Sequence, residues 1–66
     1  MATTLTAGQQ GVLHMYDKEI AHFKAQRDMA EKSGNYEDVS YYGSKVWELK
    51  QERQTTLETF MAQQTG

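Results

Sequence analysis

Ser33-Gly34-Asn35 decides the fold, because this short polar stretch separates two long segments that repeat apolar residues every three or four positions. Neither segment contains proline. Gly34 suits the left-handed conformation that ends a helix, and Asn35 suits the N-cap of the next helix. A turn this tight predicts antiparallel neighbours. We therefore expect an all-α fold that consists of a two-helix antiparallel hairpin.

The ends of the two helices are also marked in the sequence. Thr6-Ala7-Gly8-Gln9 fits a capping box, so the first helix is expected to begin after Thr6. Glu37 and Asp38 complement the dipole at the start of the second helix. The expected parts are a flexible N-terminal tail at 1–5, a helical hairpin at 6–63 (helix about 7–33, turn 33–35, helix about 36–63) and a frayed C-terminus at 64–66.

Each helix carries one apolar stripe, and the two stripes should form the seam of the hairpin. The antiparallel register pairs residues whose numbers sum to about 69. Gly43 lies inside the second helix, where glycine makes the helix less stable than alanine would. We therefore expect that another segment approaches the backbone closely at this position. The stripes are Val12, Leu13, Tyr16, Ile20, Phe23, Arg27 and Ala30, and then Tyr36, Val39, Tyr42, Gly43, Val46, Leu49, Arg53, Leu57 and Phe60.

A lone hairpin of this size leaves half of each apolar stripe exposed to water. Small scaffolds with so small a core are usually stabilised by disulfides, a metal or further subunits. Cysteine is absent, so disulfides are excluded. We therefore expect a homo-oligomer, either a four-helix bundle or a larger helical assembly. Methionine and aromatic residues lie off the seam and form the expected partner-binding surface. These are Met15, Met29, Tyr41, Trp47 and Met61.

Composition argues against several classes of function. The net charge is −2 with no basic run, so no nucleic-acid partner is expected. The chain lacks an apolar run that could span a bilayer and a cleavable secretion signal, which favours a cytoplasmic protein without a membrane partner. No phosphate-binding loop or cysteine nucleophile is present, and two helices offer no deep cleft. We expect no enzymatic activity and no cofactor.

Two arginines lie on the seam, and the expected register puts Arg53 beside Tyr16 and Arg27 beside Tyr42. Each guanidinium can stack on a ring or meet its hydroxyl. One interpretation is structural, with the arginine stems lying along the seam and the charges at its edge. The alternative is an anion-binding set of Arg27, Arg53, Tyr16 and Tyr42, which would make the protein an oligomeric binder of a small anion such as a nucleotide.

A metal site is the second alternative. Glu19-Ile20-Ala21-His22 places a carboxylate and an imidazole one turn apart on one helix face, the spacing used in di-metal four-helix bundles. Glu48 or Glu52 would add carboxylates from the second helix. The competing interpretation is a solvated helix face, because this spacing is common on charged helices.

The turn region resembles the UVR-type hairpin of bacterial excision-repair subunits, which pairs with another hairpin. The similar residues are Met29–Val39 and Lys45–Leu49. This chain has Val39–Gly43 where that family has a small-residue pair followed by Leu-Arg-Asp, so we do not assign it to the family. The function expected from the residues is a non-enzymatic interaction and assembly module that binds a protein partner, of the kind found among small viral (phage) structural or inhibitory accessory proteins.

Overall fold

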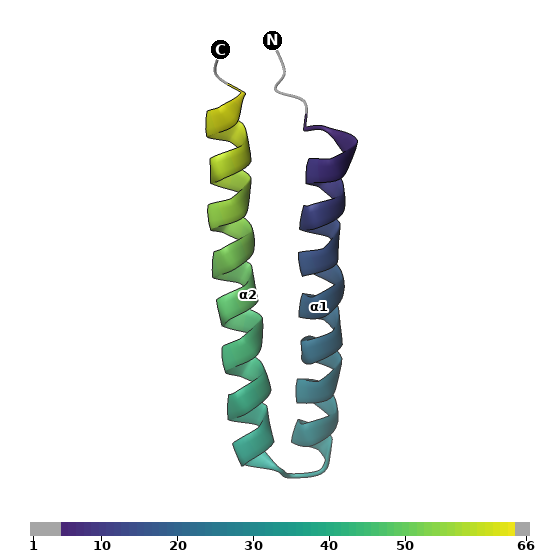
Figure 1. Ribbon diagram of the computed structural model, residues 1–66. Helices are drawn as coiled ribbons and strands as arrows, with labels where there is room; N and C mark the ends of the chain where they lie inside the picture. Colours follow the sequence, from purple (N-terminus) through teal and green to yellow (C-terminus); the bar gives the residue numbers. More distant parts are fainter. Residues whose placement is uncertain (1–4, 65–66) are drawn as a thin grey trace.

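Two long helices joined by a tight turn make up the protein. The computed structural model describes residues 5–64, with α1 at Ala7–Lys32 and α2 at Tyr36–Gln63. The helices run antiparallel and side by side, so the start of α1 and the end of α2 lie at the same end of the rod (Figure 1). The predicted two-helix hairpin is confirmed. Of the expected terminal tails, residues 1–4 and 65–66 lie outside the described residues.

A capping box opens α1, as predicted. The Thr6 hydroxyl accepts a hydrogen bond from the Gln9 backbone N–H at 3.1 Å, and the Gln9 side-chain oxygen accepts one from the Thr6 N–H at 3.0 Å. Two donors that no helical carbonyl can reach are thereby satisfied. These contacts fix where the helix begins.

The turn has the geometry that its three residues predict. Gly34 adopts a φ of 74°, which is the left-handed conformation. The N–H groups of Asn35 and Gly34 donate to the carbonyls of Ala30 and Glu31, which is the Schellman arrangement at the end of a helix. The Asn35 side-chain oxygen then accepts from the Asp38 N–H at 3.3 Å and so caps α2. The chain therefore reverses direction within three residues.

The seam follows the predicted register to within one residue. Arg53 contacts Asp17 and the Arg27 side chain approaches Gly43, and both pairs have numbers that sum to 70. Most stripe residues are buried or half-buried between the helices, but only four residues of the described part reach the buried class, and each of them keeps 4–9% of its area exposed. These are Leu13, Ile20, Ala30 and Val46.

Two stripe assignments were wrong. Val12 is 40% exposed and Tyr36 is 72% exposed. Val12 lies about 100° around the helix from Leu13, which takes the buried position. Tyr36 is the first residue of α2, and the register places it opposite Gly34 in the turn, where α1 has already ended. Tyr36 therefore has no facing helix to pack against, and Val12 lies at the open margin of the seam.

The prediction of a close backbone approach at Gly43 is also wrong within the hairpin. A Cβ added at Gly43 would lie 3.8 Å from Cδ of Arg27, which is ordinary van der Waals contact. The Arg27 stem lies along the seam, in agreement with the structural interpretation of this arginine. Nothing within the chain therefore requires glycine at this position.

Gly43→Ala is expected to stabilise the hairpin by about 0.5–1 kcal/mol, because alanine loses less backbone entropy in a helix and the added methyl group has room. Denaturant unfolding of the two proteins side by side measures the difference. A less stable alanine variant would show that Gly43 meets a surface other than Arg27.

Candidate interaction surface

One side of the hairpin carries a shallow, continuous groove between the two helices. Two hollows lie along it and share Glu19, Leu49 and Glu52. The larger has a volume of about 690 Å³. Side chains from both helices line the groove, namely Val12, Met15, Tyr16, Lys18, Glu19, His22 and Phe23 from α1, and Tyr41, Lys45, Glu48, Leu49 and Glu52 from α2.

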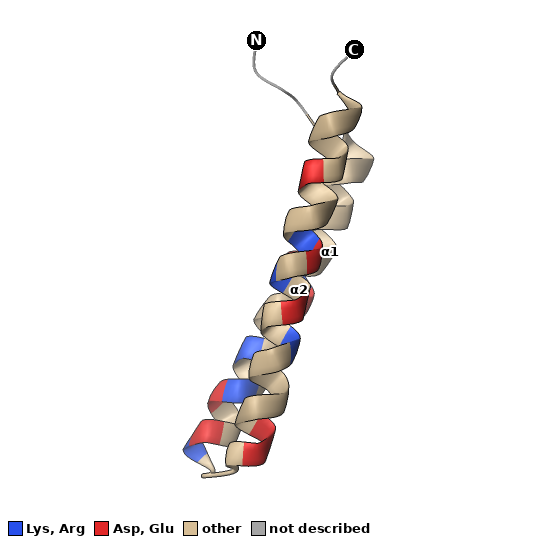
Figure 2. Cartoon of the chain, turned by 90° about the vertical axis from the view of Figure 1, so that its left-hand side faces the viewer, with Lys and Arg blue, Asp and Glu red and all other residues tan. Residues whose placement is uncertain are grey.

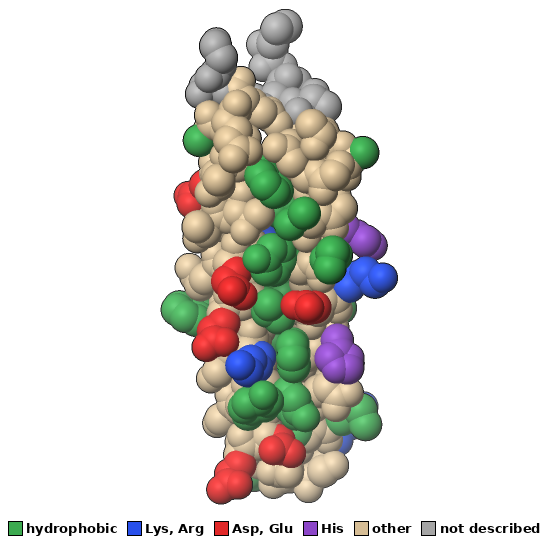
Figure 3. All heavy atoms as spheres, in the orientation of Figure 1, with side chains coloured by type: hydrophobic (Ala, Val, Ile, Leu, Met, Phe, Trp, Pro, Cys, Tyr) green, Lys and Arg blue, Asp and Glu red, His purple; other side chains and the backbone are tan. Residues whose placement is uncertain are grey.

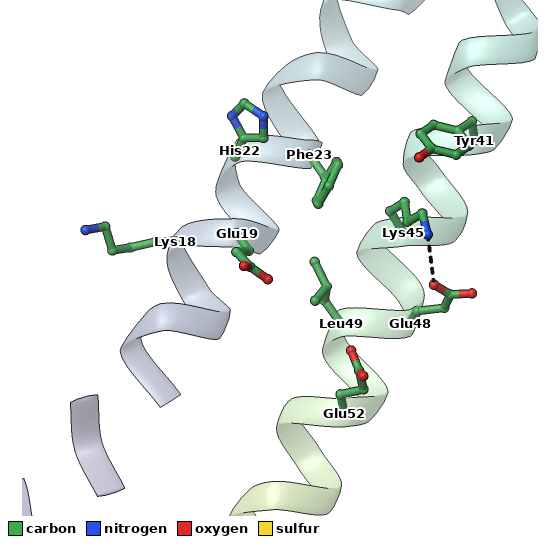
Figure 4. A pocket seen from close by; sticks show the side chains of 9 residues that line it. All are labelled: Lys18, Glu19, His22, Phe23, Tyr41, Lys45, Glu48, Leu49 and Glu52. Atoms are coloured by element: carbon green, nitrogen blue, oxygen red, sulfur yellow. Dashed lines mark ion pairs between the residues drawn. The ribbon is translucent and has the colours of Figure 1, made fainter. Parts of the chain in front are cut away.

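The floor of the groove is apolar and its margins are charged. Phe23 and Leu49 are half-buried and extend into the space between the helices, with Glu19 and Glu52 beside them (Figure 4). Figure 3 shows hydrophobic side chains in a strip between the helices, with charged and histidine side chains beside it in the middle and turn portions of the rod. Water covers an apolar strip that a second protein surface could cover instead.

Lys45 is the cation of the groove margin on α2. Its Nζ atom lies 3.7 Å from Oε2 of Glu48 and 5.6 Å from the centroid of the Tyr41 ring. Tyr41 also stacks edge-on against Tyr42, with ring centroids 5.2 Å apart. These contacts hold the Lys45 charge at the edge of the apolar floor, on the half of the groove nearer the turn.

The charge of the whole rod is uneven along its length. Residues 5–16 carry no Lys, Arg, Asp or Glu, and Glu58 is the only such residue in 54–64. Figure 2 shows the charged positions gathered in the middle and turn portions of the rod. The end opposite the turn is therefore polar and apolar but nearly uncharged.

The four residues of the metal alternative, Glu19, His22, Glu48 and Glu52, all line the groove. Within residues 5–64, however, no group of three or more His, Asp or Glu side chains is close enough to hold a metal ion. The pair on α1 and the pair on α2 lie on opposite margins of an apolar floor (Figure 4). A single hairpin therefore offers at most isolated ligands at this surface.

The two arginines of the anion alternative lie far apart in one chain. Arg53 makes an ion pair with Asp17, the neighbour of Tyr16 in the sequence, with Nε 2.7 Å from Oδ1. Arg27 lies 3.9 Å from Asp28. Because Arg27 follows Asp17 by ten residues of α1, the two guanidinium groups are separated by about 15 Å along the rod. Each guanidinium group already lies near a carboxylate of the same chain.

The expected partner-binding residues are all exposed, but the structure does not gather them on one surface. Met15 and Tyr41 line the groove. Trp47 is 64% exposed and lines a further hollow of α2 with Ser40, Gly43, Ser44 and Glu48, and Glu48 also belongs to the groove margin. We call this second surface the Trp47 face. Met29 and Met61 line neither hollow.

The side of the hairpin opposite the groove carries a further hollow, in which apolar and charged side chains meet. The hollow is lined by Gln10, Gly11, Leu13, His14, Asp17 and Arg53. The ion pair between Arg53 and Asp17 bridges the two helices on this side. Both sides of the seam therefore expose apolar surface.

Sequence reasoning missed two features of the groove. Phe23 and Leu49 were assigned to the closed seam, yet both line the open groove. Lys45 was not singled out, since a lone lysine on a charged helix has no signal of its own. Its position matters only when the register places it relative to the acidic residues of the same margin.

Neither described helix is long and apolar enough to cross a membrane. Comparisons with protein-family models, with curated proteins and with solved structures found no match for this chain. Its function is therefore inferred from its own residues and their arrangement.

Proposed function

We propose that the protein is a non-enzymatic helical-hairpin assembly module that associates with copies of itself and presents its remaining surface to a protein partner. One observation carries the proposal: among the described residues, the exposed large hydrophobic side chains outnumber all of the buried hydrophobic ones. The buried set is Leu13, Ile20, Ala30 and Val46, and the exposed set is Val12, Met15, Met29, Tyr36, Tyr41, Trp47 and Met61.

This imbalance is unusual for a chain that works alone. Scattered exposed apolar residues are normal, but seven large ones on so small a protein favour the presence of an interface. Methionine and aromatic residues are also the types enriched at protein interfaces. A second hairpin laid over the first would cover the half-buried seam and complete a four-helix bundle.

The Trp47 face is the surface proposed for a protein partner. All of its lining residues come from α2, and it shares only Glu48 with the groove. Tryptophan contributes strongly to binding energy when a partner buries it in a pocket. Ser40, Gly43 and Ser44 beside it are small, which allows a partner to approach the helix backbone closely.

Thermal unfolding at different protein concentrations tests the self-association. If folding and association are coupled, a hundredfold increase, from about 5 μM to about 500 μM, should raise the melting temperature by about 10 °C for a dimer. Circular dichroism at both concentrations measures the shift. Coincident melting curves would contradict the proposal, because a folded monomer melts at a temperature independent of concentration.

A further inference from the structure

We infer that the end of the rod opposite the turn opens and closes as one unit, in which residues 7–16 of α1 and residues 54–63 of α2 unfold together while the rest of the hairpin stays helical. We call these two segments the opening end. The ion pair between Arg53 and Asp17 lies at its boundary. The inference concerns the motion of one chain, so it does not rest on the proposed self-association.

The opening end contains little of the hydrophobic core. Among its described residues only Leu13 is buried, whereas the other three buried residues of the hairpin lie between the boundary and the turn. The ring contact between Phe23 and Tyr42, which joins the two helices with centroids 6.1 Å apart, lies in that part as well. A segment with few buried apolar contacts opens at a smaller free-energy cost than the whole protein.

The polar contact that joins the helices near their far ends is long. Nε2 of Gln64 donates to Oε1 of Gln9 at 3.4 Å, which is beyond the usual length of an N–H···O hydrogen bond. At the boundary, in contrast, Nε of Arg53 lies 2.7 Å from Oδ1 of Asp17. The short polar contact between the helices is therefore at the base of the opening end and not at its tip.

The sequence of the opening end also favours the helical state only weakly. Gly8 and Gly11 lie in the first two turns of α1, and glycine is among the poorest residues inside a helix. Thr55 and Thr59 lie near the end of α2, where the Thr59 hydroxyl donates to the Thr55 carbonyl at 2.9 Å. Side-chain bonds of this kind slightly destabilise a helix. The capping box offsets part of this loss, at the first turn of α1.

The charges near the helix ends increase the contrast between the two ends of the rod. At the turn, Lys32 lies in the last turn of α1, and Glu37 and Asp38 lie in the first turn of α2, where each charge complements the helix dipole. At the other end, the first turn of α1 has no acidic residue and the last turn of α2 has no basic one. Figure 2 shows the same contrast along the rod. The dipoles are therefore stabilised at the turn alone.

The two segments of the opening end depend on each other. The register places Leu57 opposite Leu13, and Tyr16 and Phe60 are half-buried in the same part of the hairpin. A helical segment of about ten residues is not stable in water without such packing. When one segment unfolds, the other loses its apolar cover and unfolds with it. Opening thus uncovers Leu13, Leu57 and Phe60, and this end can change shape while the turn part keeps its form.

Hydrogen exchange of the full chain, followed for each amide by NMR, tests the inference. The amides of residues 11–16 and 56–62 should share one protection factor, at least about tenfold lower than that of residues 20–30 and 40–50. The change between the two levels should fall near Asp17 and Arg53. A gradual decline along each helix would instead indicate ordinary fraying of two separate ends, and it would overturn the inference.

Gly11→Ala tests whether the two segments open together. A Cβ added at Gly11 would meet no atom of another segment within 4 Å, so alanine strengthens the α1 segment without a new contact to α2. It should slow exchange about two- to fivefold in residues 56–62 of α2 as well as in residues 11–16. Gly43→Ala is the matched control, because it makes the same change in the turn part and should leave exchange at the opening end unchanged.

All three proteins are compared at the same concentration. Slower exchange confined to α1 in Gly11→Ala would show that the two helices fray separately. Equal protection along both helices would show that the hairpin opens only as a whole, and so would a Gly43→Ala variant that slows exchange at both ends alike. Each of these results would overturn the inference.

Discussion

Val46→Asp is expected to abolish the folded hairpin at room temperature. Val46 is 4% exposed, the least of the four buried side chains, and it lies at the centre of the seam. A carboxylate there would lose its hydration without gaining a partner, which costs several kcal/mol in a protein interior. A domain of this size has a total stability of only about 3–10 kcal/mol. The substitution removes most or all of it.

Far-ultraviolet circular dichroism measures the result as a loss of helical signal and of the cooperative melt. Gln51→Asp is the matched control, because Gln51 is exposed on the same helix and its replacement introduces the same charge. The control should remain folded. A helical Val46→Asp variant with an unchanged melting temperature would show that the seam does not hold the two helices together.

Gly34→Val is expected to destabilise the hairpin by about 1–2 kcal/mol. The φ of 74° at Gly34 is a conformation in which a Cβ atom, and above all a branched one, is crowded by its own backbone. An added Cβ would meet no other atom within 4 Å. The whole effect is therefore expected from backbone conformation and not from a clash with a neighbour.

Gly34→Asn is the matched control for this position, since asparagine visits the left-handed conformation more readily than other residues with a side chain. It should lose clearly less stability than the valine variant in urea or guanidinium unfolding. Equal stability of the two variants would mean that the turn relaxes to a different geometry when Gly34 is replaced.

The turn and the helix ends were predictable because each depends on contacts between residues close in sequence. The Thr6 and Gln9 capping box, the Gly34 conformation and the Asn35 cap all involve partners within five positions. The register followed from the length of the turn. Local chemistry was therefore sufficient to define the hairpin.

The groove was not predictable from the same information. Periodicity gives the direction in which a stripe faces, but it does not say which margin of the stripe a neighbouring helix covers. Phe23 and Leu49 share the period of Ile20 and Val46, yet the first two line the groove and the last two are buried.

Arg53 illustrates a further limit, because it pairs with Asp17, the residue next to the Tyr16 beside which the expected register placed it. Both candidates lie within reach of a long side chain that starts on the facing helix. Sequence spacing alone placed the arginine on the seam, but only the arrangement of the two helices determines the group that it meets.

Sedimentation equilibrium of the wild-type protein is the most direct test of the central claim that the hairpin works as an assembly. One chain has a mass of 7.6 kDa. Self-association predicts a weight-average mass that rises with concentration to at least twice that value, together with helicity that falls as the protein is diluted. A constant mass of 7.6 kDa up to hundreds of micromolar, from a chain that still melts cooperatively, would contradict it.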